Sequence, residues 1–200
     1  MNRLLRKFKR VLYPTNTIVL RRLESHLWYD TDTRMFEAMF ELLCEYVENE
    51  LAFAASYNES TRWERFKLYW LPRQYRYEIS RKFAMKYLEW EMQVDGGEGD
   101  QAISAQKVKE LYEWYRDIYP FIKNPYESAQ DPEYMFLDVN GNPTNEAFVK
   151  DDNGKYYKMN KFHPEYSRLL NQMNDDEVQL NEMIDEKLRI LLSIRRYLWT

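Results

Sequence analysis

Glycine and proline are scarce in this chain and gather in a few places, which restricts the folds that it can adopt. The 200 residues include five glycines and seven prolines. Three of the glycines lie in one loop, residues 95–100, and five of the prolines lie between residues 120 and 164. Sandwiches and barrels need frequent turns, which are rich in both residue types. The remaining segments are uninterrupted, and we therefore predict a mainly α-helical protein.

Apolar residues at spacings of three and four support this prediction in several segments. The clearest segment is residues 33–57, which follows Asp30, a residue type that favours the N-cap of a helix. Its apolar positions are Met35, Phe36, Met39, Phe40, Leu43, Tyr46 and Val47. The same periodicity predicts helices over residues 2–13, 75–94, 101–119 and 164–198.

The length of the chain indicates one hydrophobic core, because a chain of this size buries about 70% of its extended surface. We expect a single-domain helical bundle over residues 1–200. Residues 1–25 would form a basic N-terminal helix and a bridging segment, and residues 121–163 a small irregular excursion. Within the excursion, Asn153-Gly154 lies between two short apolar runs and predicts a β-hairpin with a type I′ turn.

The helix predicted over residues 164–198 carries apolar residues at an average spacing of 3.5, the repeat of helices that pack side by side. Glu177 and Lys187 interrupt this seam. The pattern fits an antiparallel helix packed within the chain. It also fits a coiled-coil homodimer formed through this long C-terminal helix.

The net charge of −4 conceals strong segregation along the chain. Residues 1–25 carry a net charge of +6 and residues 26–60 carry −7, whereas residues 61–90 carry +5 and the remaining residues carry −8. Such blocks pair inside a helical fold, face solvent or meet a charged partner.

Four glutamates lie on one stripe of the helix predicted over residues 33–57. They are Glu37, Glu41, Glu45 and Glu48, and their spacing of four, four and three stacks like charges on one another. The stripe therefore needs compensating charge. The basic segment at residues 62–86 is the internal candidate, and a cation or an external protein is the alternative.

Two basic segments are candidate sites for an anion or a nucleic acid. The N-terminal helix presents Arg3, Arg6, Lys7, Lys9 and Arg10, and the second segment presents Arg62, Arg65, Arg73 and Arg76 among aromatic residues. Arginines beside aromatic rings suit phosphate contacts and base stacking, and they also suit a protein interface. The pattern equally describes a helix whose rings form core and whose arginines face solvent, and we favour this interpretation for residues 62–77.

Residue types that commonly carry catalysis are few. Cys44 is the only cysteine and lies among apolar residues, so we expect a buried, inert thiol. With His26 and His163 as the only histidines, a histidine-rich metal site is excluded, and no nucleophile elbow or glycine-rich nucleotide loop occurs. We expect no enzyme, cofactor or metal site. The enzymatic alternative is a carboxylate-metal hydrolase built on Asp30, Glu37, Glu41 or Glu45.

The sequence also bears on cellular location. No run of 18 apolar residues occurs, so we expect no membrane-spanning helix. Charged residues interrupt the apolar segment near the N-terminus, which argues against a signal peptide. The expectation is therefore a cytosolic protein.

Several strings resemble uncharacterised proteins encoded by tailed bacteriophages. They are Leu27-Trp28-Tyr29-Asp30, MFEAMFELLCEYVENE from Met35 to Glu50, Tyr87-Leu88-Glu89-Trp90-Glu91, ELYEWY from Glu110 to Tyr115, and IRRYLWT from Ile194 to Thr200. The resemblance covers most of residues 27–126 and the C-terminal segment, and it does not extend to the basic start or to residues 132–162. It implies a viral protein made in the cytoplasm of a bacterial host, with a role in the virion or against host machinery, and it implies no particular activity.

The lack of catalytic motifs and the segregated charge together favour a non-enzymatic protein that binds a phage or host protein. The alternative is a nucleic-acid-binding accessory protein that uses the N-terminal helix and residues 62–86.

Overall fold

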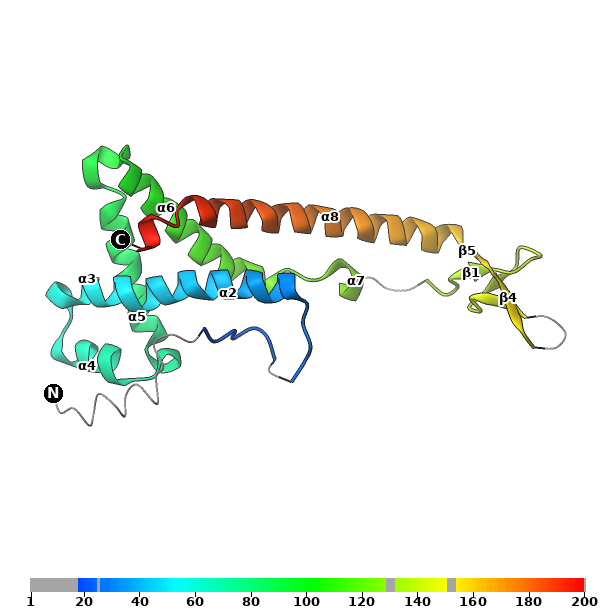
Figure 1. Cartoon of the computed structure of the whole chain (residues 1–200), viewed down its shortest axis with the longest axis horizontal. Helices are drawn as coiled ribbons and strands as arrows, with labels where there is room; N and C mark the ends of the chain where they lie inside the picture. Colours follow the sequence, from blue (N-terminus) through cyan, green and yellow to red (C-terminus); the bar gives the residue numbers. More distant parts are fainter. Residues whose placement is uncertain (1–17, 25, 129–131, 151–153, 200) are drawn as a thin grey trace. The chain divides into compact units, whose positions relative to one another are not determined.

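The computed structural model describes residues 18–24, 26–128, 132–150 and 154–199, and this part of the chain is mainly helical, as predicted (Figure 1). The helix predicted over residues 2–13, with its five basic side chains, lies outside the described residues. The expected single domain stays a prediction, and within the chain two compact units are distinguished. Unit 1 comprises Met1–Pro120 and Leu188–Thr200, and unit 2 comprises Phe121–Lys187.

Unit 1 begins with one continuous helical run, drawn in blue to cyan in Figure 1. It consists of α2 (Thr31–Glu45), the π-helical segment η1 (Tyr46–Leu51) and α3 (Ala52–Glu59), which confirms the helix predicted over residues 33–57. Asp30 is the N-cap, and its Oδ1 accepts a hydrogen bond from the backbone N–H of Thr33 at 2.7 Å. This bond satisfies one of the N–H groups that the first turn leaves without a helical partner.

Two further helices follow in close succession. They are α4 (Arg62–Trp70) and α5 (Arg73–Glu91), separated by Leu71-Pro72. Thr61 and Glu64 form a capping box at the start of α4, in which each side chain accepts a hydrogen bond from the other residue's backbone N–H. Because proline restricts the preceding residue to extended backbone, Pro72 explains the break between the two helices.

The glycine-rich loop leads into the last helices of the first half of the chain. A short 3-10 turn, η2 (Val94–Gly97), is followed by α6 (Asp100–Glu113), the π-helical segment η3 (Trp114–Ile118) and the 3-10 turn η4 (Tyr119–Phe121). Gly97 has a φ of +83°, and a Cβ at this position would lie 3.2 Å from the carbonyl oxygen of Met92. A side chain there would be strained on both counts.

The core of unit 1 lies where α3 and η1 pack along α5 and where α5 packs along α6. Its largest buried apolar side chains include Phe40, Leu43, Leu68, Leu88 and Leu111. Full burial of such a side chain contributes about 1.5–3 kcal/mol. The predicted inert thiol of Cys44 is also fully buried in this core. Leu191 and Ile194, from the C-terminal part of the unit, are buried as well.

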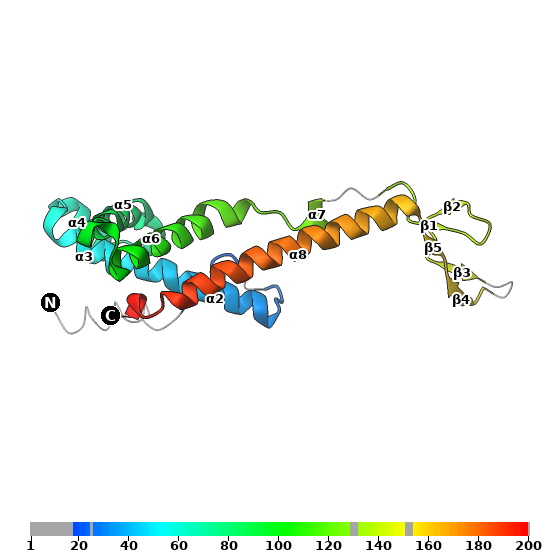
Figure 2. The same ribbon diagram turned by 90° about the horizontal axis from the view of Figure 1, so that it is seen from above.

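Unit 2 contains the predicted excursion and most of the last helix. Its elements are α7 (Pro125–Ser128), β1 (Phe136–Leu137), β2 (Pro143–Thr144), β3 (Phe148–Lys150), β4 (Tyr156–Met159), β5 (Lys161–Phe162) and the first part of α8 (Pro164–Ser193). β1 pairs antiparallel with both β2 and β5, while β3 and β4 form the predicted hairpin. Figure 2 shows these strands gathered at the N-terminal end of α8.

The long C-terminal helix is confirmed, although it ends at Ser193 and a 3-10 turn, η5 (Tyr197–Trp199), follows. Within unit 2, α8 contacts α7, where the hydroxyl of Tyr126 donates to Oδ1 of Asn174 at 2.6 Å, and the small sheet, where the rings of Phe136 and Phe162 lie against Tyr166. Neither contact is the long antiparallel helix pair that the 3.5 repeat suggested. No helix among the described residues is both long and apolar enough to cross a membrane.

Candidate functional site

Three glutamates of the predicted stripe are buried in unit 1. Glu37 and Glu41 of α2 and Glu48 of η1 expose 3%, 1% and 0% of their surface, respectively. We call Glu37, Glu41 and Glu48 the carboxylate cluster. Burying an unpaired carboxylate costs several kcal/mol, so each of these side chains requires a compensating partner.

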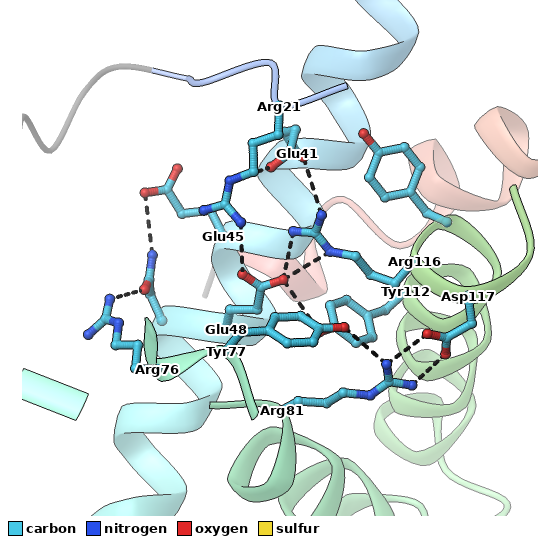
Figure 3. A network of polar contacts seen from close by, with 12 residues as sticks. Arg21, Glu41, Glu45, Glu48, Arg76, Tyr77, Arg81, Tyr112, Arg116 and Asp117 are labelled. Atoms are coloured by element: carbon cyan, nitrogen blue, oxygen red, sulfur yellow. Dashed lines mark hydrogen bonds and ion pairs between the residues drawn. The ribbon is translucent and has the colours of Figure 1, made fainter. Parts of the chain in front are cut away.

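Arginines from two separate parts of unit 1 supply these partners (Figure 3). Arg116 of η3 donates to Oε1 of Glu48 from Nε at 3.0 Å and from Nη2 at 2.7 Å, and from Nη1 to Oε1 of Glu41 at 3.4 Å. Arg21 approaches the same two carboxylates from the other side, with nitrogen to oxygen distances of 3.9 Å to Glu41 and 3.8 Å to Glu48. Because one guanidinium spans two carboxylates, Arg116 ties η3 to the run formed by α2 and η1.

Glu37 has its own partners at the N-terminal end of the cluster. Nε of Arg22 lies 3.4 Å from Oε1 of Glu37, and the hydroxyl of Tyr115 donates to Oε2 at 2.5 Å. The guanidinium of Arg22 also lies 4.4 Å from the ring centroid of Tyr119. Burial raises the pKa of Glu37, although the Tyr115 hydroxyl and Arg22 act in the opposite direction. Three glutamates therefore meet three arginines.

Tyrosines close the cluster toward the core. The hydroxyl of Tyr112 donates to Oε1 of Glu48 at 3.4 Å, and burial raises the pKa of both Tyr112 and Tyr115. These hydroxyls stay protonated and act as donors near neutral pH. Rings of Tyr115 and Phe40 stack with centroids 4.9 Å apart, so the polar cluster passes directly into the aromatic core.

The arginines differ from those that the sequence suggested. We expected residues 62–86 to compensate the stripe, but the partners of the carboxylate cluster are Arg21, Arg22 and Arg116. Glu45 differs from the other three acids, because it is only half-buried and accepts a hydrogen bond from Nδ2 of Asn49 at 3.5 Å. Oδ1 of Asn49 in turn accepts from Arg76, which is the contribution of the 62–86 segment at this edge.

Two π-helical segments hold the cluster, since Glu48 lies in η1 and both Tyr115 and Arg116 lie in η3. Single π-helical turns are frequent at functional sites, but they also adjust the direction of side chains within a long helix.

Among the described residues, no three acids, cysteines or histidines are arranged to hold a metal ion. Asp30, the fourth acid of the enzymatic alternative, serves as the N-cap of α2. The geometry of the carboxylate cluster is that of a closed ion-pair network.

A second site lies on the surface of α4, where the structure contradicts the expected aromatic core. Trp63, Phe66, Tyr69 and Trp70 expose between 38% and 63% of their surface, and Tyr75 of α5 is exposed as well. Leu68 is the buried apolar residue of α4. The rings of Trp63 and Phe66 stack on each other with centroids 5.3 Å apart and an interplanar angle of 8°. The four rings are spaced by three and four and lie on one exposed face of α4, whereas Leu68 lies on the opposite, covered side.

Beside these rings lies a groove between α3 and α4, with a volume of about 400 Å³. Phe53, Ser56 and Leu68 are the more buried residues of its lining. The outer lining residues are Tyr57, Arg62, Arg65, Phe66, Tyr69 and Trp70. We call this feature the α3–α4 groove.

The predicted anion-binding arginines have different positions. Arg62 and Arg65 are exposed beside the groove, and neither forms an ion pair among the described residues. Arg76 turns inward, where its guanidinium donates to the backbone oxygen of Leu68 and to Asn49 and lies 5.1 Å from the ring centroid of Phe53. The side chain of Arg73 and the basic residues Arg3, Arg6, Lys7, Lys9 and Arg10 lie outside the described part.

The sequence reasoning missed the three arginines of the carboxylate cluster and the exposure of the α4 rings. Arg116 directly follows Trp114 and Tyr115 in the sequence, and a cation next to large aromatic residues that form core is a signal for a buried partner. Comparison with known proteins adds no further site residue, because no family model, no curated protein and no solved structure matches this chain.

Proposed function

We propose that this protein acts by binding another protein through the α3–α4 groove, without catalysis. The observation that carries the proposal is the set of exposed rings on α4 around a groove lined by Arg62 and Arg65. Aromatic residues and arginine are enriched at protein interfaces and dominate their binding energy. Exposed apolar patches of this kind are typical of interaction sites.

Charge distinguishes this proposal from nucleic-acid binding. A groove that follows a phosphate backbone needs a row of free cations. Arg81 pairs with Asp117, Lys82 pairs with Glu64 at 3.0 Å, and Arg76 is engaged by Asn49, so three bases of the 62–86 segment are used within unit 1. Of the other bases in this segment, Arg62 and Arg65 line the groove. This pair suits a protein segment that presents a few carboxylates beside an apolar anchor.

The resemblance to proteins of tailed bacteriophages supports a cellular setting for this activity. In the proposal the partner is a phage or host protein, met in the cytoplasm of a bacterial host or in the virion. Neither role requires a cofactor.

Co-purification from the bacterial host tests the proposal. The tagged full chain is compared with Phe66→Ala/Trp70→Ala, which removes two rings of the groove, and with Trp28→Ala, which removes an 87% exposed ring elsewhere. We expect a stoichiometric partner with the wild type and the Trp28 variant, and at least a roughly tenfold loss of affinity with the groove variant, because central aromatic residues contribute about 2 kcal/mol or more.

Two results would contradict the proposal. One is a partner that binds the groove variant as well as it binds the wild type. The other is tight binding of a single-stranded oligonucleotide that quenches tryptophan fluorescence, is lost in Phe66→Ala/Trp70→Ala and falls steeply with salt. That result would identify the groove as a nucleic-acid site.

A further inference from the structure

We propose that the α3–α4 groove also receives the acidic face of α8 from a second copy of this chain. This inference rests on the proposed function, since it assigns a particular occupant to the same groove. The charge, the exposure and the spacing of side chains on α8 within unit 2 support it.

The first part of α8 is strongly acidic. Residues 164–187 contain seven acids and two bases, and all seven acids are exposed. Among the described residues, none of Glu182, Asp185 and Glu186 forms an ion pair. Surplus carboxylates on one helix repel each other, and a cationic surface relieves this repulsion.

Apolar side chains accompany these carboxylates on the same half of the helix. Val178 and Met183 expose 55% and 40% of their surface. Asp175, Val178, Glu182 and Glu186 are spaced by three, four and four, so they lie on one side of α8. This side presents a short apolar contact between carboxylates.

The α3–α4 groove has the complementary arrangement. Phe66 and Tyr69 form an apolar surface, and Arg62 and Arg65 stand beside it without an acidic partner in the described chain. On α4, Arg62, Phe66 and Tyr69 are spaced by four and three and share one face. A helix whose carboxylates flank Val178 or Met183 therefore meets both arginines and both rings.

The charge also favours this contact over pairing of two α8 helices. A homodimer through the seam of α8 would bring together two segments that each carry seven acids and two bases. Pairing α8 with the groove brings together opposite charges instead. Because the two surfaces differ, the contact is either made twice in a reciprocal dimer or repeated head-to-tail in rings or open chains.

The contact is small, so we expect weak self-association that grows with concentration. Sedimentation velocity on the full chain from about 1 μM to about 1 mM should show a rising sedimentation coefficient. Raising the salt from about 50 mM to about 500 mM should weaken the association, since exposed ion pairs are screened.

Charge reversal provides the decisive comparison. Arg62→Glu/Arg65→Glu reverses the charge of both groove arginines, and Glu182→Lys/Glu186→Lys reverses the charge of the two carboxylates beside Met183. Each variant alone places like charges on the two surfaces and should stay monomeric. An equimolar mixture of the two restores opposite charges at every contact between one variant and the other, so the two variants should associate with each other as the wild type does.

Matched controls separate this effect from a change in net charge. Arg195→Glu/Arg196→Glu and Glu98→Lys/Glu110→Lys make the same charge changes at exposed positions outside α3, α4 and the first part of α8. Both should associate as the wild type does. Circular dichroism and thermal unfolding of every variant verify that each one folds.

Three outcomes would overturn the inference. The first is a wild type that stays monomeric over the whole concentration range. The second is association that survives either reversal. The third is a mixture that stays monomeric. If the groove variant Phe66→Ala/Trp70→Ala still loses its co-purified partner in any of these cases, the proposed function stands and only the second copy is excluded as the occupant.

Discussion

Arginine and aromatic side chains gather at two places in unit 1. The two places differ in whether the arginines have an acidic partner among the described residues. In the carboxylate cluster, three buried glutamates face Arg21, Arg22 and Arg116. At the α3–α4 groove, Arg62 and Arg65 have no acidic partner among the described residues, and the rings beside them are open to solvent. The same residue types therefore hold one part of the fold together and leave another part available for binding.

Burial, more than residue type, separates the structural network of the carboxylate cluster from the interaction surface at the groove. A buried ion pair is expensive to break, because the remaining charge has no water to solvate it. An exposed arginine loses little when it is replaced, because it was solvated before. Identical substitutions at the two places should therefore lower the free energy of unfolding by very different amounts.

The largest effect is expected for Arg116→Met. Removal of this guanidinium leaves Glu48 and Glu41 buried without their closest cation, so the free energy of unfolding should fall by about 3–5 kcal/mol. Urea denaturation measures the change. Arg65→Met is the matched control at the groove and should change it by less than about 0.5 kcal/mol.

A second variant sharpens this test. In Glu48→Leu/Arg116→Met both charges are replaced by apolar groups, which should recover much of the lost stability. An equal loss of unfolding free energy in Arg116→Met and Arg65→Met would show that Arg116 stabilises the fold no more than an exposed arginine of the groove does.

A smaller effect is expected for Tyr115→Phe. The variant keeps the ring stacked on Phe40 and removes the hydroxyl that donates to Glu37 at 2.5 Å. Loss of a buried donor to a carboxylate should cost about 1–3 kcal/mol, measured by thermal or urea unfolding. Tyr57→Phe, at a 79% exposed position of the groove, should cost nothing measurable. If Tyr115→Phe leaves the free energy of unfolding unchanged, the hydroxyl does not stabilise Glu37.

The capping box of α4 should contribute about 1 kcal/mol. Thr61→Ala removes the oxygen that accepts from the backbone N–H of Glu64, and the first turn of α4 then lacks its side-chain cap. Hydrogen exchange of the first amides of α4 should become faster, whereas exchange in α2 stays unchanged. Thr61→Ser keeps the hydroxyl and should behave as the wild type, and an equal loss in both variants would contradict a capping role.

Dependence on pH should separate Glu37 of the carboxylate cluster from Glu64 of the α4 capping box by the sign of the change in stability. Burial raises the pKa of Glu37 above its ordinary value of 4.5, so its contribution to stability is present below 4.5 and is lost as the pH rises through the raised pKa. In contrast, hydrogen bonds from Thr61 and from Lys82 lower the pKa of Glu64 to about 2. That contribution is present above 4.5 and is lost as the pH falls toward 2.

Stability measured across this pH range in two variants tests both signs. Glu37→Gln should flatten the decline on the alkaline side of 4.5, and Glu64→Gln should flatten the decline on its acidic side. A wild type whose stability rises steadily above pH 4.5, with no change in Glu37→Gln, would show that burial does not control this carboxylate.

The elements of the fold could be predicted where the local pattern decides them. The spacing of Phe36, Phe40, Leu43 and Val47 predicts the helical run of α2 and η1, and Asn153-Gly154 predicts the pairing of β3 with β4. Both signals involve residues close in sequence. The two π-helical segments leave no comparable pattern, because their extra residue per turn is small against the tolerance of a helical period.

The two sites could be predicted only in part. The stripe Glu37, Glu41 and Glu48 is visible in the sequence, but Arg116 lies 68 residues from Glu48 and its approach depends on tertiary packing. On α4 the rings share one face at spacings of three and four, which is the pattern of a buried apolar stripe and predicts core. The rest of the chain covers the opposite side, where Leu68 lies, and this choice depends on tertiary packing.

The division of unit 1 into two stretches of sequence has a consequence for how the protein is made. Leu191 and Ile194 are buried in a unit whose other residues end at Pro120. At ordinary translation rates of about 5–20 residues per second, the nascent helices of residues 31–120 wait about 4–15 seconds for these two side chains. During that interval the aromatic core has an uncovered edge that chaperones can recognise, and a ribosome stalled between the two stretches would release a chain that is prone to aggregate.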